Sequence, residues 1–437
     1  MRLAFTALAV TLAAQIATTV ALNAPAILAP VAAPALGLPA ERIGWFTGLA
    51  YCSAMFTGLI ASHHVSRIGA VRLTQWAMLA SAAGLCLLAL HQTWLVLPAA
   101  FAMGLGYGCT NPAAADILTR HTPSHRRGLF FSIKQTGVPL GVGFAGLSLS
   151  ALLVWFSWWL SSLIMIIPCL AVALLSQPSR SRLENEPAAN EPTKPAGPQA
   201  EAPSAATVQT APRARLEQQN SARFSFSALR ASMVGPLKLV FGDTHLRRLA
   251  LSSFAYSSTQ ICFVTFLVSF FHLELGQSIS FAALVLAGSQ AVSTLGRVFW
   301  GYVSDRWLPP GLLLGLLGLS MAICMLWLSR LDAQSSSLNL MICASACAAT
   351  VVAWNGVYFA EMANRAPLGR IAQANGGIQF VTFFGGMVGP VLFGLGVSAS
   401  GSYGLPLALC SLLPAAAGLS FLHAYRVERA GKRLRAQ

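Results

Sequence analysis

Long apolar stretches separated by short polar turns dominate this chain. Roughly twelve of them are apolar over about 17 to 25 residues, the length that a helix needs to cross the hydrocarbon core of a bilayer. Only 9% of the residues are charged, so a water-soluble fold is excluded. The pattern predicts an all-α membrane protein with twelve transmembrane helices, over residues 4–28, 43–63, 73–90, 94–117, 129–149, 152–175, 249–271, 281–303, 312–328, 338–360, 371–397 and 405–425.

The predicted helices fall into two groups of six, in residues 1–175 and 249–425. The intervening cytoplasmic linker, 176–248, is rich in Pro, Ala, Glu and Gln up to about residue 221 and has no apolar periodicity there, which predicts disorder. From Phe224 to Arg248 apolar side chains return among basic ones, a pattern typical of a helix lying on the membrane surface. Residues 426–437 are expected to form a basic cytoplasmic tail.

Similar residues recur at matching positions in the two groups. Asn111 in the fourth predicted helix has a counterpart, Asn355, in the tenth, at an offset of 244. Three glycines of the fifth helix recur in the eleventh at a single offset of 248: Gly128, Gly137 and Gly141 match Gly376, Gly385 and Gly389. Three matches at one spacing predict two pseudo-symmetric six-helix bundles.

Positive charge is concentrated on one side of the predicted helices. The chain has 28 Lys and Arg against 13 Asp and Glu, and the loops on one side hold only Arg42 and Arg330. Such asymmetry reports membrane orientation rather than a nucleic acid partner, and it predicts a bacterial inner-membrane protein with both termini in the cytoplasm. A signal peptide over residues 3–21 is the alternative for the N-terminus, but its removal would leave eleven crossings.

Several kinds of chemistry are disfavoured by the sequence. All nine cysteines lie inside predicted helices and no CxxC pair occurs, so we interpret them as packing residues and expect neither a metal site nor a cofactor. The chain has no GxxxxGK[ST], HExxH or GxSxG motif, which argues against ATP hydrolysis and against an enzyme.

Two loop segments carry a recognisable motif. SHHVSRIGAVR ends the second predicted helix and GRVFWGYVSDRW ends the eighth. They resemble the two copies of G-x-x-x-D-R-x-G-x-[RK]-[RK] in the major facilitator superfamily. The first copy has Ser66 in place of Asp but keeps Arg67 and Arg72, whereas the second keeps Asp305 and Arg306 and continues with LPPG.

This resemblance implies a transporter whose two halves rock around a central cavity, and it covers nearly the whole chain outside the linker. The segments NPAAADILTR and SIKQTGVPLG are similar to those of the cyanate permease-like branch. The motif's acid would cap the N-terminus of a neighbouring helix and latch the inner gate. Asp305 has the position for this role, and in the first half Asp116 could pair instead with Arg72 or Arg120.

The eleventh helix contains a second motif. Its spacing of Gly376, Gly385, Gly389 and Pro390 resembles a glycine and proline motif that the superfamily's proton antiporters carry in the fifth helix. In this chain the fifth helix has Val142 where that proline would fall. The alternatives for these glycines are close helix packing and a flexing helix between the halves.

Two basic residues, Lys134 and Arg297, lie inside predicted helices, and neither is repeated in the other half. Because a charged side chain in a membrane span is energetically costly, we expect both residues to face the cavity and bind an anionic substrate. The alternative is that they reach the lipid headgroups or brace the gate. Uncharged polar residues at similar depth complete the predicted substrate site: Asn23, Gln135, Gln260, Gln290, Asn355 and Gln379. For each of these, hydrogen bonding between helices is the alternative to ligand contact.

Acid–base pairs near the cytoplasmic ends are repeated instead. Asp116 and Glu361 each precede an arginine by four residues, Arg120 and Arg365, a helix spacing that allows pairing. Repetition favours a structural latch over a proton carrier. We therefore predict gating roles for these pairs and for the motif residues Arg67, Arg72, Asp305 and Arg306.

Together these features predict a secondary active transporter that moves a small organic solute, which we expect to be an anion, by alternating access through the lipid bilayer. A proton-coupled efflux antiporter for drugs or sugars and a non-transporting membrane sensor are the alternatives. For the anion transporter and for the efflux antiporter, coupling to protons is left open by the sequence.

Overall fold

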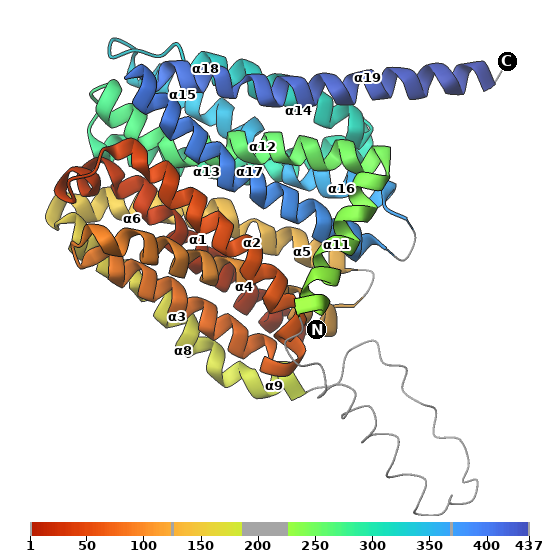
Figure 1. The fold of residues 1–437 in the computed structure, drawn as a ribbon, viewed down its shortest axis with the longest axis horizontal. Helices are drawn as coiled ribbons and strands as arrows, with labels where there is room; N and C mark the ends of the chain where they lie inside the picture. Colours follow the sequence, from red (N-terminus) through yellow and green to blue (C-terminus); the bar gives the residue numbers. More distant parts are fainter. Residues whose placement is uncertain (1, 124–125, 186–225, 368–369, 436–437) are drawn as a thin grey trace, which may run out of the picture.

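The computed structural model describes residues 2–123, 126–185, 226–367 and 370–435, and in this part of the chain every regular element is helical. Twelve helical segments are long and apolar enough to cross a membrane, so the predicted number is confirmed. The two six-helix halves lie side by side, and both termini are at the same end of the bundle (Figure 1). The predicted disordered stretch lies largely outside the described residues.

Six membrane-crossing segments form the first half. Their helices are α1 (Arg2–Ala35), α2 (Ile43–Ile68), α3 (Ala70–Ala89), α4 (Val96–His121), the pair α5 (Arg127–Gln135) and α6 (Gly137–Trp155), and the pair α7 (Trp158–Ile164) and α8 (Ile166–Ser176). Short 3₁₀ turns, η1 (Ala40–Arg42) and η2 (Thr93–Leu95), precede α2 and α4. Helical structure continues past α8 through η4 (Gln177–Ser179) and α9 (Arg180–Asn185), within the segment assigned to the linker.

The second half is preceded by α11 (Phe226–Gly242), within the segment predicted to lie on the membrane surface. Its six membrane-crossing segments are α12 (Thr244–Ser269) with η5 (Phe270–Glu274), α13 (Ile279–Arg306), α14 (Pro310–Leu328), α15 (Ser337–Cys347) with η6 (Ala348–Val352) and α16 (Asn355–Arg365), α17 (Ile371–Ser400), and α18 (Gly404–Cys410) with α19 (Leu412–Arg435). α12 is almost completely enclosed by protein, whereas α8 is among the most exposed.

We call the end that carries the termini the basic end, because Arg67, Arg120 and Arg365 lie there, and we call the other the opposite end. The two halves meet mainly where α2 packs on α17 and α6 packs on α13. Near the basic end, α5 and α16 pack chiefly against helices of their own half. The halves therefore hold each other most closely away from the basic end.

Small residues make this close contact possible. A Cβ atom at Gly48 of α2 would come within 2.8 Å of the carbonyl oxygen of Met387 in α17, and one at Gly146 of α6 within 2.8 Å of the carbonyl oxygen of Ala283 in α13. Hydrogen bonds add to the contact, since Ser280 donates to the carbonyl oxygen of Ser150 over 3.1 Å. The opposite end is thus closed by backbone-to-backbone packing.

Candidate functional site

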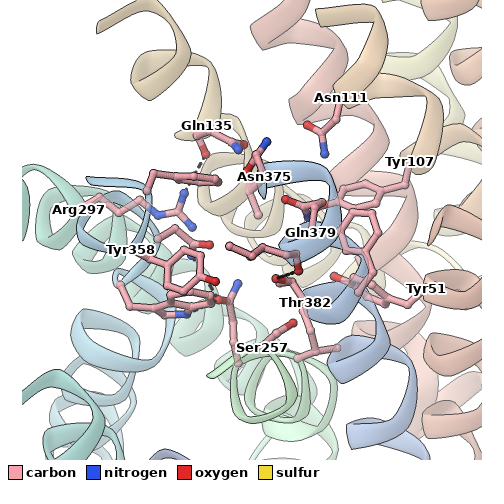
Figure 2. Close-up of a pocket in the computed structure, with 18 residues that line it drawn as sticks. Tyr51, Tyr107, Asn111, Gln135, Ser257, Arg297, Tyr358, Asn375, Gln379 and Thr382 are labelled. Atoms are coloured by element: carbon pink, nitrogen blue, oxygen red, sulfur yellow. Dashed lines mark hydrogen bonds between the residues drawn. The ribbon is translucent and has the colours of Figure 1, made fainter. Parts of the chain in front are cut away.

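A polar cavity lies between the two halves (Figure 2). Residues of α2, α4, α5 and α6 line it from the first half, and residues of α12, α13, α16 and α17 line it from the second. Its free volume for water-sized occupants is about 70 Å³, room for a few waters or a small ligand. The lining residues are Tyr51, Tyr107, Asn111, Gln135, Val138, Ser257, Gln260, Ile261, Arg297, Trp354, Asn355, Tyr358, Phe359, Asn375, Ile378, Gln379, Thr382 and Phe383.

Arg297 reaches into this cavity from α13 and bonds to two backbone carbonyl groups. Its Nη1 atom donates to the carbonyl oxygen of Gln135 over 3.0 Å, and its Nη2 atom donates to that of Val352 over 3.2 Å. The first bond crosses from one half to the other, and the second stays within the second half. The guanidinium is therefore held where the halves meet.

Both carbonyl groups are available because their helices are interrupted. In a continuous helix the carbonyl of Gln135 would accept from the residue four positions on, but that residue is Pro139, which has no N–H. The chain accordingly breaks between α5 and α6. In the tenth span the π-helical turn η6 ends at Val352, and α16 starts only at Asn355.

Among the described residues, no acid compensates the charge of Arg297. None of the eighteen lining residues is Asp or Glu, and none of the ion pairs in the described part of the chain involves Arg297. Its Nε atom is buried and has no hydrogen-bond partner among the described residues. A charged side chain buried in a membrane-spanning helix is costly when no opposite charge compensates it.

Gln260, Trp354 and Asn355 form a hydrogen-bonded group on the wall made by the second half. The Oε1 atom of Gln260 accepts from Nε1 of Trp354 over 2.9 Å and from Nδ2 of Asn355 over 3.4 Å. Because an indole N–H can only donate, the Gln260 oxygen must face Trp354. The amide nitrogen of Gln260 is then left to donate elsewhere.

Lys134 is buried behind the wall made by the first half. Its side chain is 2% exposed and is absent from the cavity lining. The Nζ atom donates to Oε1 of Gln15 and to Oδ1 of Asn111, each over 2.5 Å. Of these two acceptors, Asn111 lines the cavity and Gln15 does not.

Three aromatic rings contact one another across the boundary between the halves. The ring of Tyr51 lies 6.0 Å from that of Tyr107 and 5.9 Å from that of Phe383 in the other half. Tyr51 also packs against Gly386, where a Cβ would come within 2.8 Å of its ring. All three rings line the cavity. In Figure 2, Tyr51 and Tyr107 lie across the cavity from Arg297.

The structure brings together five of the eight residues predicted for the substrate site: Gln135, Gln260, Arg297, Asn355 and Gln379 all line the cavity. The other three, Lys134, Asn23 and Gln290, do not. Asn23 donates to the carbonyl oxygen of Thr19 in its own helix. Gln290 is 1% exposed, donates to Ser289 over 3.4 Å, and packs against Gly143 in α6.

Several lining residues were not expected from the sequence, among them Tyr51, Tyr107, Ser257, Asn375, Thr382 and Phe383. Their positions depend on how each helix is rotated about its axis, which hydropathy does not report. The sequence does single out Asn111, because Asn355 repeats it in the second half. That repeat predicted two related halves but not a position of Asn111 in the cavity wall.

The predicted acid–base pairs are formed at the basic end. Arg120 contacts Asp116 at 3.0 Å, and Arg365 contacts Glu361 at 2.9 Å and Glu428 at 3.0 Å. Glu361 also lies beside Gly311, in the first turn of α14. These contacts join α16 to α14 and α19.

The acid at the N-terminus of α3 was not expected from the sequence. Oε1 of Glu184 accepts from the backbone N–H groups of Val71 and Arg72 over 3.2 and 3.3 Å, and Oε2 of Glu184 contacts Arg180 at 2.8 Å.

Asp305 and Arg306 are exposed, and neither forms a hydrogen bond or ion pair through its side chain in the described part of the chain. That part also holds no cluster of His, Cys, Asp and Glu suited to a metal ion.

Comparison with known proteins identifies the family. The family model of the Major Facilitator Superfamily matches residues 7–390 and 249–437. No curated protein matches the chain.

Solved transporter structures have the same fold. A bacterial homolog of the human lysosomal transporter Spinster, inward-facing and unoccupied, is 17% identical, with a TM-score of 0.66 over 97% of this chain and 95% of that one. A POT family transporter in complex with 5-aminolevulinic acid is 14% identical, with a TM-score of 0.71 over 95% of both chains. A mutant of the nucleoside transporter NupG is 12% identical, with a TM-score of 0.66 over 95% of this chain and 99% of that one. The chain therefore belongs to the Major Facilitator Superfamily and is a multi-pass membrane transporter rather than an enzyme.

Proposed function

We propose that this protein carries a small organic anion across the bacterial inner membrane by alternating access, with the basic end in the cytoplasm. The observation that carries the proposal is the charge of the cavity: Arg297 lines it, and no carboxylate of the described residues does. A neutral or cationic solute would leave the guanidinium uncompensated, whereas a carboxylate would pair with it.

The donors around the cavity support the same choice. A guanidinium has five N–H groups, and the hydrogen bonds of Arg297 account for two of them. Its Nε–H is buried and lacks a partner among the described residues, so it is available to a ligand. Gln260 contributes a further amide donor whose orientation Trp354 fixes.

The packing of the halves supports an inward-facing arrangement. Backbone contacts close the opposite end at Gly48 and Gly146, while α5 and α16 pack chiefly within their own halves near the basic end. With the basic end in the cytoplasm, the cavity would exchange its solute with the cytoplasm in this conformation. Opening the other way requires the contacts of Gly48 and Gly146 to separate.

The alternative of a proton-coupled efflux antiporter rests on the glycines of the eleventh span. In the structure Gly385 and Gly389 lie against α12. A Cβ at Gly385 would come within 2.5 Å of the carbonyl oxygen of Phe254, and one at Gly389 within 2.9 Å of Ser258. Close packing therefore accounts for both glycines. The anion carrier is the better supported function.

Thermal stabilisation of the purified protein tests the proposal, because a ligand that binds the folded state raises its melting temperature. The sodium salts of acetate, lactate, succinate and benzoate would be compared with the corresponding amides and with choline chloride. We expect at least one carboxylate to stabilise the protein and its amide to have no effect. Equal stabilisation by a carboxylate and its amide, or by choline alone, would contradict an anion site.

A further inference from the structure

Two amide side chains of the first half have counterparts in the second. Gln15 of α1 and Asn111 of α4 correspond to Gln260 of α12 and Asn355 of α16, at offsets of 245 and 244. Each pair is brought together across two helices of its own half. The second half therefore shows how the pair is arranged without a lysine, because the position equivalent to Lys134 is occupied by Thr382.

The hydrogen bonds run in opposite directions in the two halves. In the second half, Nδ2 of Asn355 donates to Oε1 of Gln260 and to the carbonyl oxygen of Val352, so the amide nitrogen of Asn355 is turned toward the protein. In the first half, Oδ1 of Asn111 and Oε1 of Gln15 both accept from Nζ of Lys134. The ammonium group thus takes the place of the direct contact between the two amides.

An ammonium group has donors only, so it holds the oxygen of Asn111 and leaves the amide nitrogen on the other side. Figure 2 shows the nitrogen of Asn111 directed toward the cavity. We propose that Lys134 is a positioning residue: it fixes the amide of Asn111 so that the first half presents a hydrogen-bond donor to the substrate anion. In the second half, by contrast, the equivalent residue Asn355 presents an acceptor. This inference rests on the proposed anion transport.

The burial of Lys134 fits this indirect role. Gln15, one of its two acceptors, is itself 1% exposed, and Gly137 lies against the Gln15 side chain, where a Cβ would come within 2.9 Å. The lysine is therefore enclosed by α1, α4 and its own helix. An anion in the cavity would contact Asn111 and not Lys134.

A double-mutant cycle separates positioning from simple charge attraction. The probe is the small carboxylate that stabilises the unaltered protein most, and its Kd is measured by calorimetry for Lys134→Gln, Asn111→Leu and the double variant. Glutamine keeps a polar side chain of similar length but can offer either a donor or an acceptor to Asn111. We expect Lys134→Gln to raise the Kd about tenfold alone and less than about twofold in the Asn111→Leu background.

Asn355→Leu provides the matched background. There Lys134→Gln should still raise the Kd about tenfold, because Asn111 is intact. If Lys134 acts through its charge alone, its replacement will weaken binding equally in all backgrounds, and the proposal is overturned. An unchanged Kd for Lys134→Gln in the unaltered protein also overturns it.

Asn111→Asp tests the same idea with Lys134 in place, which guards against a Lys134 variant that fails to fold. Aspartate keeps an oxygen toward the ammonium group but presents a second oxygen, instead of a nitrogen, to the cavity. We expect loss of carboxylate binding with the melting temperature of the free protein maintained; unchanged binding would refute the assignment. If no carboxylate stabilises the unaltered protein, the proposed function fails instead, so the two failures are distinguishable.

Discussion

The guanidinium of Arg297 in the second half donates to the backbone carbonyl of Gln135 in the first, over 3.0 Å, because Pro139 leaves that carbonyl without its helical partner. The bond links the two halves at the wall of the cavity. On the proposed function, an anion that takes over the guanidinium donors would loosen this link and would thereby couple substrate binding to the movement of the halves. Replacements at this link and at the two ends of the bundle should therefore have distinct effects.

Replacing Arg297 should remove carboxylate binding. Arg297→Gln eliminates the one charge of the cavity lining while keeping an amide that can reach a carbonyl, so we expect the Kd for the stabilising carboxylate to rise at least about a hundredfold. The measurement is calorimetric titration of the purified variant. Trp300→Phe is the matched control: Trp300 lies one turn away and donates to the carbonyl oxygen of Ala349 over 2.7 Å, but it does not line the cavity. Weakening of equal size in both variants would assign Arg297 a structural role only.

Adding one methyl group at Gly48 should prevent closure of the opposite end. In Gly48→Ala the new Cβ would meet the side chain of Val391 and the carbonyl oxygen of Met387, so the halves must separate there. We expect slower transport and greater labelling, by a membrane-impermeant thiol reagent, of a cysteine introduced at Ser293, a buried position on α13. Gly288→Ala is the control, since a Cβ at Gly288 has nothing within 4 Å. Identical labelling of the two variants would show that the Gly48 contact does not control access.

The carboxylate of Glu184 should stabilise the basic end of the first half. Glu184→Gln removes a negative charge from the N-terminus of α3 and the ion pair with Arg180, so we expect a loss of about 0.5–1.5 kcal/mol of stability. Thermal unfolding checks this. Arg182→Gln, an exposed position in the same helix, should have no measurable effect. A Glu184 variant as stable as the control would mean that the cap is energetically neutral.

The repeated acid–base pairs should differ in strength. Asp116 pairs only with Arg120 among the described residues, and both side chains are partly exposed, so Asp116→Asn should cost less than about 0.5 kcal/mol. Glu361 is 9% exposed, and its partner Arg365 also binds Glu428, so Glu361→Gln should cost about 1–2 kcal/mol. Thermal unfolding of the two purified variants would measure both losses of stability. A larger loss for Asp116→Asn would contradict the idea that the second-half network is the stronger latch.

Much of the fold was predictable because it depends on hydropathy alone. A bilayer needs about twenty apolar residues per crossing, so the number of helices could be read from the chain. The matching positions of Asn111 and Asn355 likewise indicated two related halves. The break at Pro139 has a simple cause that the sequence contains, namely a proline inside a span.

The cavity was less predictable. Arg297 and Gln260 were identified because charged and amide groups are rare in membrane spans. Tyr51 and Phe383 were missed because aromatic residues are common in spans and only the rotation of α2 and α17 turns these two toward each other. The position of Lys134 behind Asn111 depends on side-chain packing among three helices. The π-helical turn η6 contains no proline or glycine, so nothing in the sequence indicated it.

Solute counterflow in proteoliposomes tests the central claim most directly. Vesicles containing the purified protein would be loaded with the stabilising carboxylate and diluted into buffer with a trace of the same radiolabelled compound. We expect transient accumulation of label that is inhibited by other small carboxylates but not by their amides, and that is absent with Arg297→Gln. Accumulation that the amides inhibit equally, or that persists in Arg297→Gln, would contradict transport of an anion through this cavity.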